Sequence, residues 1–453
     1  MVRRPGRVAP RASTSLRRDR GLLLAVGAIA AAGLAIRIWY ILAVAKKSPL
    51  VGDALGFNGL ARVLSEGHGF VSPFIPPGHA AMPTAHKPPL YPLVLALVSI
   101  FGGRSYVAHQ IATAAVGAAT VLVIAVLTRR VAGWRAGVLA AVLGAGYPAF
   151  VANDASLRSE SLYVLLVALA LLAAYRVLER PSRWRLLQLG VTIGLAALTR
   201  SEGLVLLVLL AAPAVWRSGE QQRGRRVALV CAACAVVLAP WLIRCWVVFD
   251  QPVAISTNYG DLIAGANCAA TYSGPLQGEW SFPCVLGEHG RNEATIAKRL
   301  RSRGLRYASD HADRLPGVLL ARALRPWGLF RPDGEVRLHA IGEGRNQTAS
   351  WLGLAAAWGL MVLAPLGLLV LRRRRKPLFV LVAPLVLVLL VTVSGYGSLR
   401  FRAPADIALI VLGAVAVDAL WPRRRVPAMA GPQARPSTGV IEADRAGGGS
   451  NFG

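Results

Sequence analysis

Apolar residues in this chain come in long blocks separated by short polar stretches. Each block approaches the roughly twenty residues that an α-helix needs to cross the hydrocarbon core of a bilayer. The pattern predicts an all-α integral membrane protein with about ten transmembrane helices, within a range of about nine to twelve. The expected helices lie at about 21–45, 104–128, 137–153, 159–178, 186–199, 203–216, 227–248, 349–371, 377–394 and 404–421.

The polar stretches carry their charges unevenly. Arg and Lys cluster at every second junction between the blocks, which is the positive-inside pattern of membrane proteins. This pattern predicts a basic cytoplasmic N-terminus (1–20) and a polytopic unit (21–421) with outer loops at about 46–103 and 250–348. The Gly-, Ala- and Pro-rich tail (422–453) is expected to be disordered and cytoplasmic.

Composition agrees with this topology. Hydrophobic residues make up 55% of the 453 positions and charged residues 16%, where a soluble domain carries about 25% charged residues. The net charge of +29 suggests nucleic-acid binding when taken alone. Because the basic residues follow the helix ends so regularly, topology explains the charge, and no nucleic-acid partner is predicted.

Asp53 opens a stretch of the first outer loop whose apolar residues recur at helical spacing. Leu55, Leu60, Val63 and Leu64 can share one face of an amphipathic helix that lies on the membrane surface. Asp53 directly precedes them, at the N-cap position of such a helix. Spacing alone favours a helix-capping role for Asp53. A carboxylate at membrane level is also a candidate functional residue.

Three basic residues on the outer side need a further explanation. Lys87 precedes a proline-rich turn that ends at Pro92, and it either binds a lipid phosphate as a point charge or snorkels to the interface. Arg400 and Arg402 lie where the positive-inside pattern disfavours them. A guanidinium binds phosphate through a bidentate fork. The alternative for the two arginines is ion pairing between helices, for example with Asp154 or Glu160.

The five cysteines fall into two groups. Cys231, Cys234 and Cys245 lie in one apolar block and are expected to pack as small hydrophobic residues. Cys268 and Cys284 share the second outer loop, where an oxidising environment makes a disulfide between them plausible.

Several motifs, taken in order, resemble one known family. Asp53 follows the first helix, an amphipathic stretch then ends at Gly67–Phe70, and Lys87–Pro92 comes next. The later matches are Ser159–Tyr163, Ala197–Gly203, Pro240–Arg244, Ser256–Gly260, Gly265–Asn267 and Arg400–Pro404. Across about 35–415, the chain resembles the bacterial family 39/83-type glycosyltransferases, which are relatives of the protein O-mannosyltransferases and of the lipid A aminoarabinose transferase.

The resemblance implies a GT-C fold and an enzyme of the bacterial plasma membrane. Such an enzyme moves a hexosyl or pentosyl group from a polyprenyl-phosphate donor to an acceptor hydroxyl at the outer face of the membrane. It implies Asp53 as the general base, and Lys87 with Arg400 or Arg402 as the cations that bind the donor phosphate. The acceptor stays open as a glycan, a lipid or a protein. The large soluble repeat domain of the mannosyltransferases has no counterpart in the outer loops, so a protein acceptor is not implied.

A second polar site is also implied. Asp154 and Glu160 fall where family members place carboxylates near the reaction centre, for acceptor positioning or metal binding. Pairing with a nearby arginine is the slightly favoured alternative, and the candidate partners are Arg158, Arg200 and Arg244. His86 stands where the aminoarabinose transferase has Glu, so contact with the donor sugar is expected to differ. No cofactor is expected, and a divalent metal, which some GT-C enzymes use, is not favoured.

A transporter or flippase for a lipid-linked sugar is the alternative function. Transporters place charges and broken helices near the bilayer midplane, often within inverted repeats. Here the charges gather at outer helix ends, and no two halves of the sequence match. This distribution favours chemistry at the membrane surface.

Overall fold

The computed structural model describes residues 12–74, 82–219 and 222–421. Within these ranges the chain is almost wholly helical, and its only strand-like pairing is an isolated bridge between Val71 and Pro83. The predicted all-α class is therefore confirmed. The compact unit ends at Leu420, and the tail predicted to be disordered lies outside the described residues.

All ten expected membrane segments are helical, but they differ in length. Six helices are long and apolar enough to span a membrane, and a pair bent by 50° at Pro148 would make a seventh. The six are α1 (Ala12–Ala43), α4 (Tyr106–Ala132), α7 (Ser159–Glu179), α10 (Arg223–Phe249), α15 (Gln347–Arg373) and α17 (Ala403–Leu420), and the bent pair is α5 (Trp134–Gly146) with α6 (Pro148–Ala155). The other expected segments are shorter or broken: α8 (Arg183–Thr199), α9 (Ala212–Arg217) behind the irregular helices η2 (Ser201–Leu204) and η3 (Leu207–Ala211), and α16 (Phe379–Ser394).

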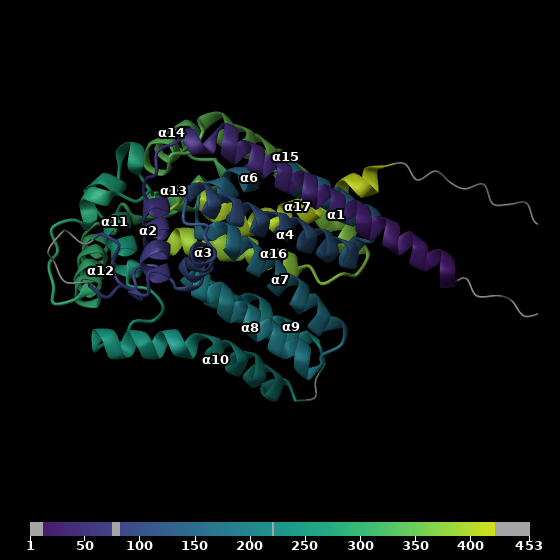
Figure 1. Cartoon of the computed structure of the whole chain (residues 1–453), viewed down its shortest axis with the longest axis horizontal. Helices are drawn as coiled ribbons and strands as arrows, with labels where there is room; N and C mark the ends of the chain where they lie inside the picture. The colour runs from purple at the N-terminus through teal and green to yellow at the C-terminus, as the bar shows by residue number, and fades with distance from the viewer. Residues whose placement is uncertain (1–11, 75–81, 220–221, 422–453) are drawn as a thin grey trace, which may run out of the picture. The chain divides into compact units, whose positions relative to one another are not determined.

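The long helices pack side by side. Helix α17 lies against α15, α5 and α7, and α1 lies against α4 and α5. Helices α8 and α10 form a second pair below them in Figure 1. Helix α17 is buried along nearly its whole length, and its apolar side chains belong to the main hydrophobic core. Helix α17 is therefore the central helix of this core.

Contacts between the basic junctions gather them at one end of the bundle. Arg130, at the end of α4, donates to Glu179 at the end of α7 (Nε···Oε1 2.8 Å), and Arg374 donates to the carbonyl of Ala132 (3.3 Å). The Tyr175 hydroxyl reaches the carbonyl of Pro377 (3.1 Å). The basic junctions that follow α4, α7 and α15 therefore lie together.

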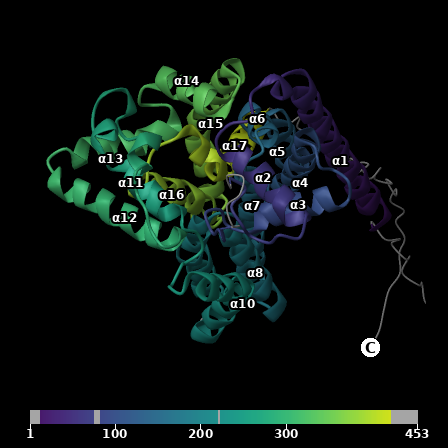
Figure 2. The same cartoon turned by 60° about the vertical axis from the view of Figure 1, so that its left-hand side comes forward.

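The loop helices gather beyond the other ends of the long helices. Figure 2 shows α11, α12 and α13 together on one side, away from α1 and α4. The segments are η1 (Ala45–Lys47), α2 (Asp53–Ser65), α3 (Leu90–Ile100), α11 (Asn258–Ala266), η4 (Ala269–Thr271), η5 (Gly274–Leu276), η6 (Phe282–Val285), α12 (Glu293–Asp310), α13 (Leu315–Leu324), η7 (Arg325–Trp327), α14 (Pro332–Glu343) and η8 (Leu399–Arg402). The apolar helix α3 lies inside the first predicted loop and was not expected from the sequence.

Helix α2 forms where the sequence predicts it, and its predicted apolar face is buried only in part: Leu60 is buried, and Val63 and Leu64 are half-buried. Leu55 is exposed, while Ala54, Phe57 and Ala61 are buried. The reason is α3, which packs against α2 and brings the Tyr91 ring edge-on to Phe57, with 4.9 Å between ring centroids. The residues that face α3 are therefore the buried ones.

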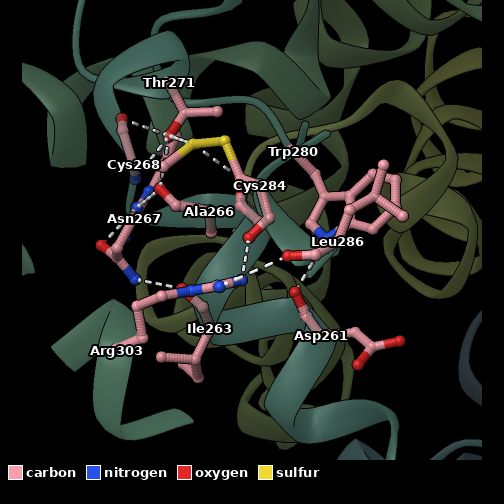
Figure 3. Close-up of a disulfide and its surroundings, with 12 residues drawn as sticks. Asp261, Ile263, Ala266, Asn267, Cys268, Thr271, Trp280, Cys284, Leu286 and Arg303 are labelled. Atoms are coloured by element: carbon pink, nitrogen blue, oxygen red, sulfur yellow. Dashed lines mark hydrogen bonds between the residues drawn. A yellow bond between two sulfur atoms is a disulfide. The ribbon is translucent and has the colours of Figure 1, made fainter. Parts of the chain in front are cut away.

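Cys268 and Cys284 are joined by a disulfide, with 6.3 Å between their Cα atoms (Figure 3). Arg303 of α12 fastens the closed loop by donating to the carbonyl of Cys284 (2.5 Å). Inside the loop, the Trp280 indole donates to the carbonyl of Asp261 in α11 (3.0 Å). The disulfide loop is thus fixed to two helices close to the candidate site.

Candidate active site

Asp53 is the first residue of α2, and its carboxylate does not cap the helix. The N-cap position is occupied by Gly52, whose φ of +58° suits glycine, and no side chain caps this end. Asp53 instead accepts hydrogen bonds from Lys87 Nζ and from Arg400 Nη1, the latter at 2.7 Å. The interpretation of Asp53 as a helix cap is therefore wrong.

Lys87 is held in place by the segment that precedes α3. The Ala85 carbonyl accepts from Thr257 N (3.1 Å), and Ala85 N donates to Glu293 (3.3 Å), so α11 and α12 both fix this segment. Two prolines follow Lys87 and stiffen the backbone as it enters α3. The Lys87 ammonium also lies 5.3 Å from the centroid of the Phe57 ring, within cation–π range.

Arg400 reaches the site from η8, at the start of the last helix. Its Nη2 donates to the Tyr396 hydroxyl (2.7 Å), and its Nη1 lies 3.4 Å from Glu343 Oε1. Its Nε lies 3.7 Å from Glu160 Oε1. Arg400 thus joins Asp53 to two further carboxylates.

Glu343 and Arg158 complete this group, and no sequence pattern pointed to Glu343. Glu343 ends α14, and its Oε1 lies 3.0 Å from Arg158 Nη1, which is 3.7 Å from Asp53 Oδ2. The other Glu343 oxygen lies 3.0 Å from Arg345. Glu343 lies in the long loop between the seventh and eighth expected spans, where neither periodicity nor charge topology singles it out. Arg158 appeared in the sequence only as a possible partner for other acids.

Glu160 and Arg200 lie beside this group. Arg200 donates to Glu160 (2.8 Å) and to Glu202 (2.5 Å). This pairing is one of those that the sequence offered for Glu160. They border a small hollow that is lined by both charged and apolar side chains. Its lining comprises Glu160, Tyr163, Arg200, Glu202, Leu387, Val388, Val391, Arg400, Phe401 and Pro404.

Three of the predicted site residues have other partners. Arg402, one of the two arginines implied for the donor phosphate, is buried and donates to Asp406 (2.8 Å) one turn along α17 rather than to Asp53. Asp154 pairs with Arg37 of α1 (2.6 Å) rather than with any of the arginines considered from the sequence. His86 Nε2 lies 2.9 Å from Asp261 Oδ2. All three side chains are committed to neighbouring helices.

The neighbouring cations lower the pKa of two carboxyl groups of the site, Asp53 and Glu343. Burial alone would raise the pKa of Asp53, but Lys87, Arg400 and Arg158 hold that pKa well below its usual range. Burial would also raise the pKa of Glu343, and Arg158 leads the charges that lower it. Glu279 behaves differently: burial raises its pKa to about 7, against the opposing effect of Arg325. Asp53 and Glu343 are therefore anionic at neutral pH.

Glu279, Glu335 and His339 form a group that could hold a metal ion among the described residues, with one ligand atom from each within 4.8 Å of the others. However, Glu335 already forms an ion pair with Arg325, and His339 Nε2 lies 2.9 Å from Ser398 Oγ. A metal would have to displace Arg325. The donors present therefore fit a salt bridge better than a metal site.

Fold and site together define a multi-pass membrane protein whose candidate site lies where loop helices meet one set of helix ends. Residues 86–244 match the family model of the dolichyl-phosphate-mannose-protein mannosyltransferases. No curated protein matches the sequence.

Several solved structures are similar to this chain. The chain resembles the archaeal oligosaccharyltransferase AglB from Archaeoglobus fulgidus, in complex with an inhibitory peptide and a dolichol-phosphate, with a TM-score of 0.53 and 15% identity over 89% of this chain and 50% of that one. The apo form of the A. fulgidus oligosaccharyltransferase gives 0.52 and 18%, over 88% and 50%. ArnT from Cupriavidus metallidurans, bound to undecaprenyl phosphate, gives 0.45 and 15%, over 86% and 77%.

These findings confirm the predicted resemblance to GT-C glycosyltransferases and the predicted GT-C membrane fold. The chain spans about half the length of the archaeal oligosaccharyltransferases that it resembles.

Proposed function

We propose that this protein is a glycosyltransferase that moves a sugar from a polyprenyl-phosphate donor to an acceptor hydroxyl at the outer face of the membrane. The observation that carries the proposal is the position of Asp53, whose carboxylate lies between the cations of Lys87 and Arg400. An enzyme of this kind needs a base for the acceptor and cations for the leaving phosphate, and here both come from one contact group.

The charge of this group suits a phosphodiester. The linked ion pairs contain five positive charges and four negative ones, which leaves one positive charge. The cations are Lys87, Arg158, Arg200, Arg345 and Arg400, and the carboxylates are Asp53, Glu160, Glu202 and Glu343. A sugar linked to a lipid phosphate carries one negative charge, so its binding would neutralise the group. Cations preorganised in this way stabilise the additional negative charge that develops on the phosphate as the glycosidic bond breaks.

Donor binding would also prepare the base. Lys87 and Arg400 can each turn from the Asp53 carboxylate toward the phosphate, because ammonium and guanidinium groups bind phosphate oxygens as readily as carboxylate oxygens. Asp53 then loses two of its hydrogen-bond donors and becomes more basic. The donor thus activates the residue that the acceptor needs.

The chemical step uses no group beyond the two substrates and the protein. The acceptor oxygen forms a bond to the anomeric carbon while its proton passes to the Asp53 carboxylate. The bond from that carbon to the phosphate oxygen breaks, and the lipid phosphate leaves with the electron pair and a second negative charge. The sugar ring passes through an oxocarbenium-like state.

The lining of the small neighbouring hollow has the character that a lipid phosphate needs. It combines Leu387, Val388 and Val391 of α16 with the cations of Arg200 and Arg400. A lipid phosphate has the same combination of an apolar chain and a charged head. The dolichol-phosphate present in the similar AglB structure supports a lipid-linked donor here.

The proposal is tested by incubating the purified protein with a panel of polyprenyl-phosphate sugars and an acceptor extract, and measuring released polyprenyl phosphate. Asp53→Asn should lower the rate by about 10²–10⁴-fold, the usual contribution of a general base, while donor binding remains. Glu66→Gln is the matched control, because Glu66 directly follows the same helix with its carboxylate well exposed.

Two results would contradict the proposal. One is full transfer by the Asp53→Asn protein. The other is protein-dependent movement of the intact donor across sealed vesicles without any release of polyprenyl phosphate, which would indicate the transporter alternative.

A further inference from the structure

Arg158 is a buried cation whose hydrogen-bonding capacity is unused. Its side chain is 1% exposed, and none of its three guanidinium nitrogens has a hydrogen-bond partner. Buried guanidinium groups are ordinarily bonded, because an unmade hydrogen bond away from water is costly. The Arg158 guanidinium is therefore within ion-pair distance of Glu343 (3.0 Å), but no nitrogen of it forms a hydrogen bond to Glu343 or to Asp53.

Arg158 and Arg400 converge on the same two oxygens. Arg158 Nη1 lies 3.0 Å from Glu343 Oε1 and 3.7 Å from Asp53 Oδ2, and Arg400 Nη1 lies 3.4 Å and 2.7 Å from the same atoms. In this structure, Arg400 therefore forms the hydrogen bond to Asp53, and Arg158 lies slightly further from the same carboxylate. An approach of about 1 Å would bring Arg158 within hydrogen-bond distance of Asp53.

The backbone before Arg158 fixes its side chain in this place. Leu157 is fully buried and has a φ of +50°, a left-handed conformation that L-residues with a branched side chain rarely adopt. Arg158 then takes an extended conformation and precedes α7. Strained residues of this kind cluster at functional sites, where the surrounding structure holds them.

The three cations near Asp53 differ in how exposed their side chains are. Lys87 and Arg400 are partly exposed, and a ligand in the adjoining hollow can reach Arg400 directly. Arg158 is enclosed. The first two can therefore move to a phosphate, whereas Arg158 stays beside Asp53.

We propose that Arg158 is a positioning residue that keeps Asp53 ionised while Lys87 and Arg400 hold the donor phosphate. The proposal rests on the function proposed above. Without Arg158, the departure of the other two cations would leave a half-buried carboxylate beside other acids, and burial would favour its protonated form. A protonated Asp53 cannot accept the proton of the acceptor.

The charged and titratable groups around Asp53 come from several elements. They are Lys87 before α3, Arg158 and Glu160 at the start of α7, Glu343 at the end of α14, Tyr396 after α16, and Arg400 in η8. The acids among them oppose ionisation of Asp53, so the remaining cation determines the outcome once the donor is bound.

The test is the pH dependence of kcat at saturating donor, with the donor chosen from the panel above. In Arg158→Gln, activity should be lost on acidification at a pH at least about one unit higher than in the wild type, because an opposite charge within about 4–6 Å lowers a carboxyl pKa by one to three units. The KM for the donor should change less than about threefold, whereas in Lys87→Gln it should rise by at least about tenfold. Arg158→Lys keeps the charge and should restore most of the wild-type profile.

Glu343→Gln is a second variant, in which the pH at which activity is lost on acidification should shift in the opposite direction. Removing this carboxylate frees Arg158 for Asp53 and removes a negative charge close to it, so activity should persist to lower pH than in the wild type. Arg37→Lys, a conservative change at another buried arginine, is the control. It should leave the acidic limb of the pH profile, meaning the fall of kcat on acidification, at the wild-type pH.

The outcomes separate the two proposals. If the wild type transfers sugar and Asp53→Asn does not, but the acidic limb stays in place in folded Arg158→Gln and in Glu343→Gln, the role of Arg158 is refuted alone. A rise in donor KM without a change in the limb refutes it as well. If no variant and no wild-type sample releases polyprenyl phosphate, the proposed function fails first.

Discussion

Arg37 and Asp154 form an ion pair inside the helix bundle, whereas Asp53 shares its charge with several cations at the end of the bundle. The first pair is closed: the side chains of Arg37 and Asp154 are 0% and 4% exposed, and Arg37 also donates to the carbonyls of Gly33 and Ala145 (3.0 Å each). The second group is open: the Asp53 side chain is 29% exposed, and its partners have unused donors.

The difference shows which buried charges belong to the scaffold. A closed pair with satisfied donors gains little from exchanging partners and loses much if one partner is removed. Packing around it is also tight, since a Cβ added at Gly117 would lie 2.8 Å from Arg37 Nε. An open group with surplus cations can exchange a carboxylate for a phosphate at small cost. Burial of charge alone would not distinguish the two.

The largest expected effect comes from a substitution that breaks the closed Arg37–Asp154 pair. Arg37→Ala leaves the Asp154 carboxylate buried without a cation, which should lower the free energy of unfolding by about 3–5 kcal/mol. Denaturant unfolding in detergent measures this loss. Asp53→Asn, in the open group, should change stability by less than about 1 kcal/mol. Equal losses in the two variants would contradict the distinction between closed and open charges.

The sequence predicted the members of the open group better than their partners. Asp53, Lys87 and Arg400 stood out because topology could not explain them, and the structure brings these three together. Arg402 was grouped with Arg400 on the same grounds, but residues two apart in a helical segment point in different directions, and Asp406 lies one turn further along. Their catalytic roles remain predictions.

The parts that were missed depend on contacts between distant segments. Glu343 and His339 belong to a loop helix with mixed polar and apolar positions, and nothing in its local pattern marks a site. Arg37 was read as part of the first spanning helix, and its partner Asp154 is 117 positions away. Helix packing decides such pairings, so a pattern within one segment could not predict them.

A second prediction uses Glu279, a buried acid of the disulfide loop. Its pKa in the folded protein is about 7, above the ordinary value of 4.5, because burial disfavours its charge. The folded state therefore binds more protons than the unfolded state between these values, so stability falls as pH rises from about 4.5 to 7 and then levels off. The loss reaches up to about 3 kcal/mol.

Glu279→Gln should remove this part of the pH dependence and stabilise the protein above pH 7. The difference in unfolding free energy between wild type and variant, measured across the window, isolates the residue from groups such as His339, whose lowered pKa acts in the opposite direction. A constant difference from about pH 4 to pH 8 would be inconsistent with the raised pKa.

The smallest expected effect comes from comparing two basic residues, Lys87 of the open group and Arg402 of a closed pair. Lys87→Gln removes a cation from the open group, and the KM for a polyprenyl-phosphate donor should rise by about 10–100-fold, equivalent to about 1.4–2.8 kcal/mol. Arg402→Lys changes a closed pair two residues from Arg400, keeps the charge beside Asp406, and should leave the donor KM unchanged. Since both residues were assigned to the donor phosphate from sequence, an equal rise in the two variants would return Arg402 to the binding site and show that the Asp406 pair also opens.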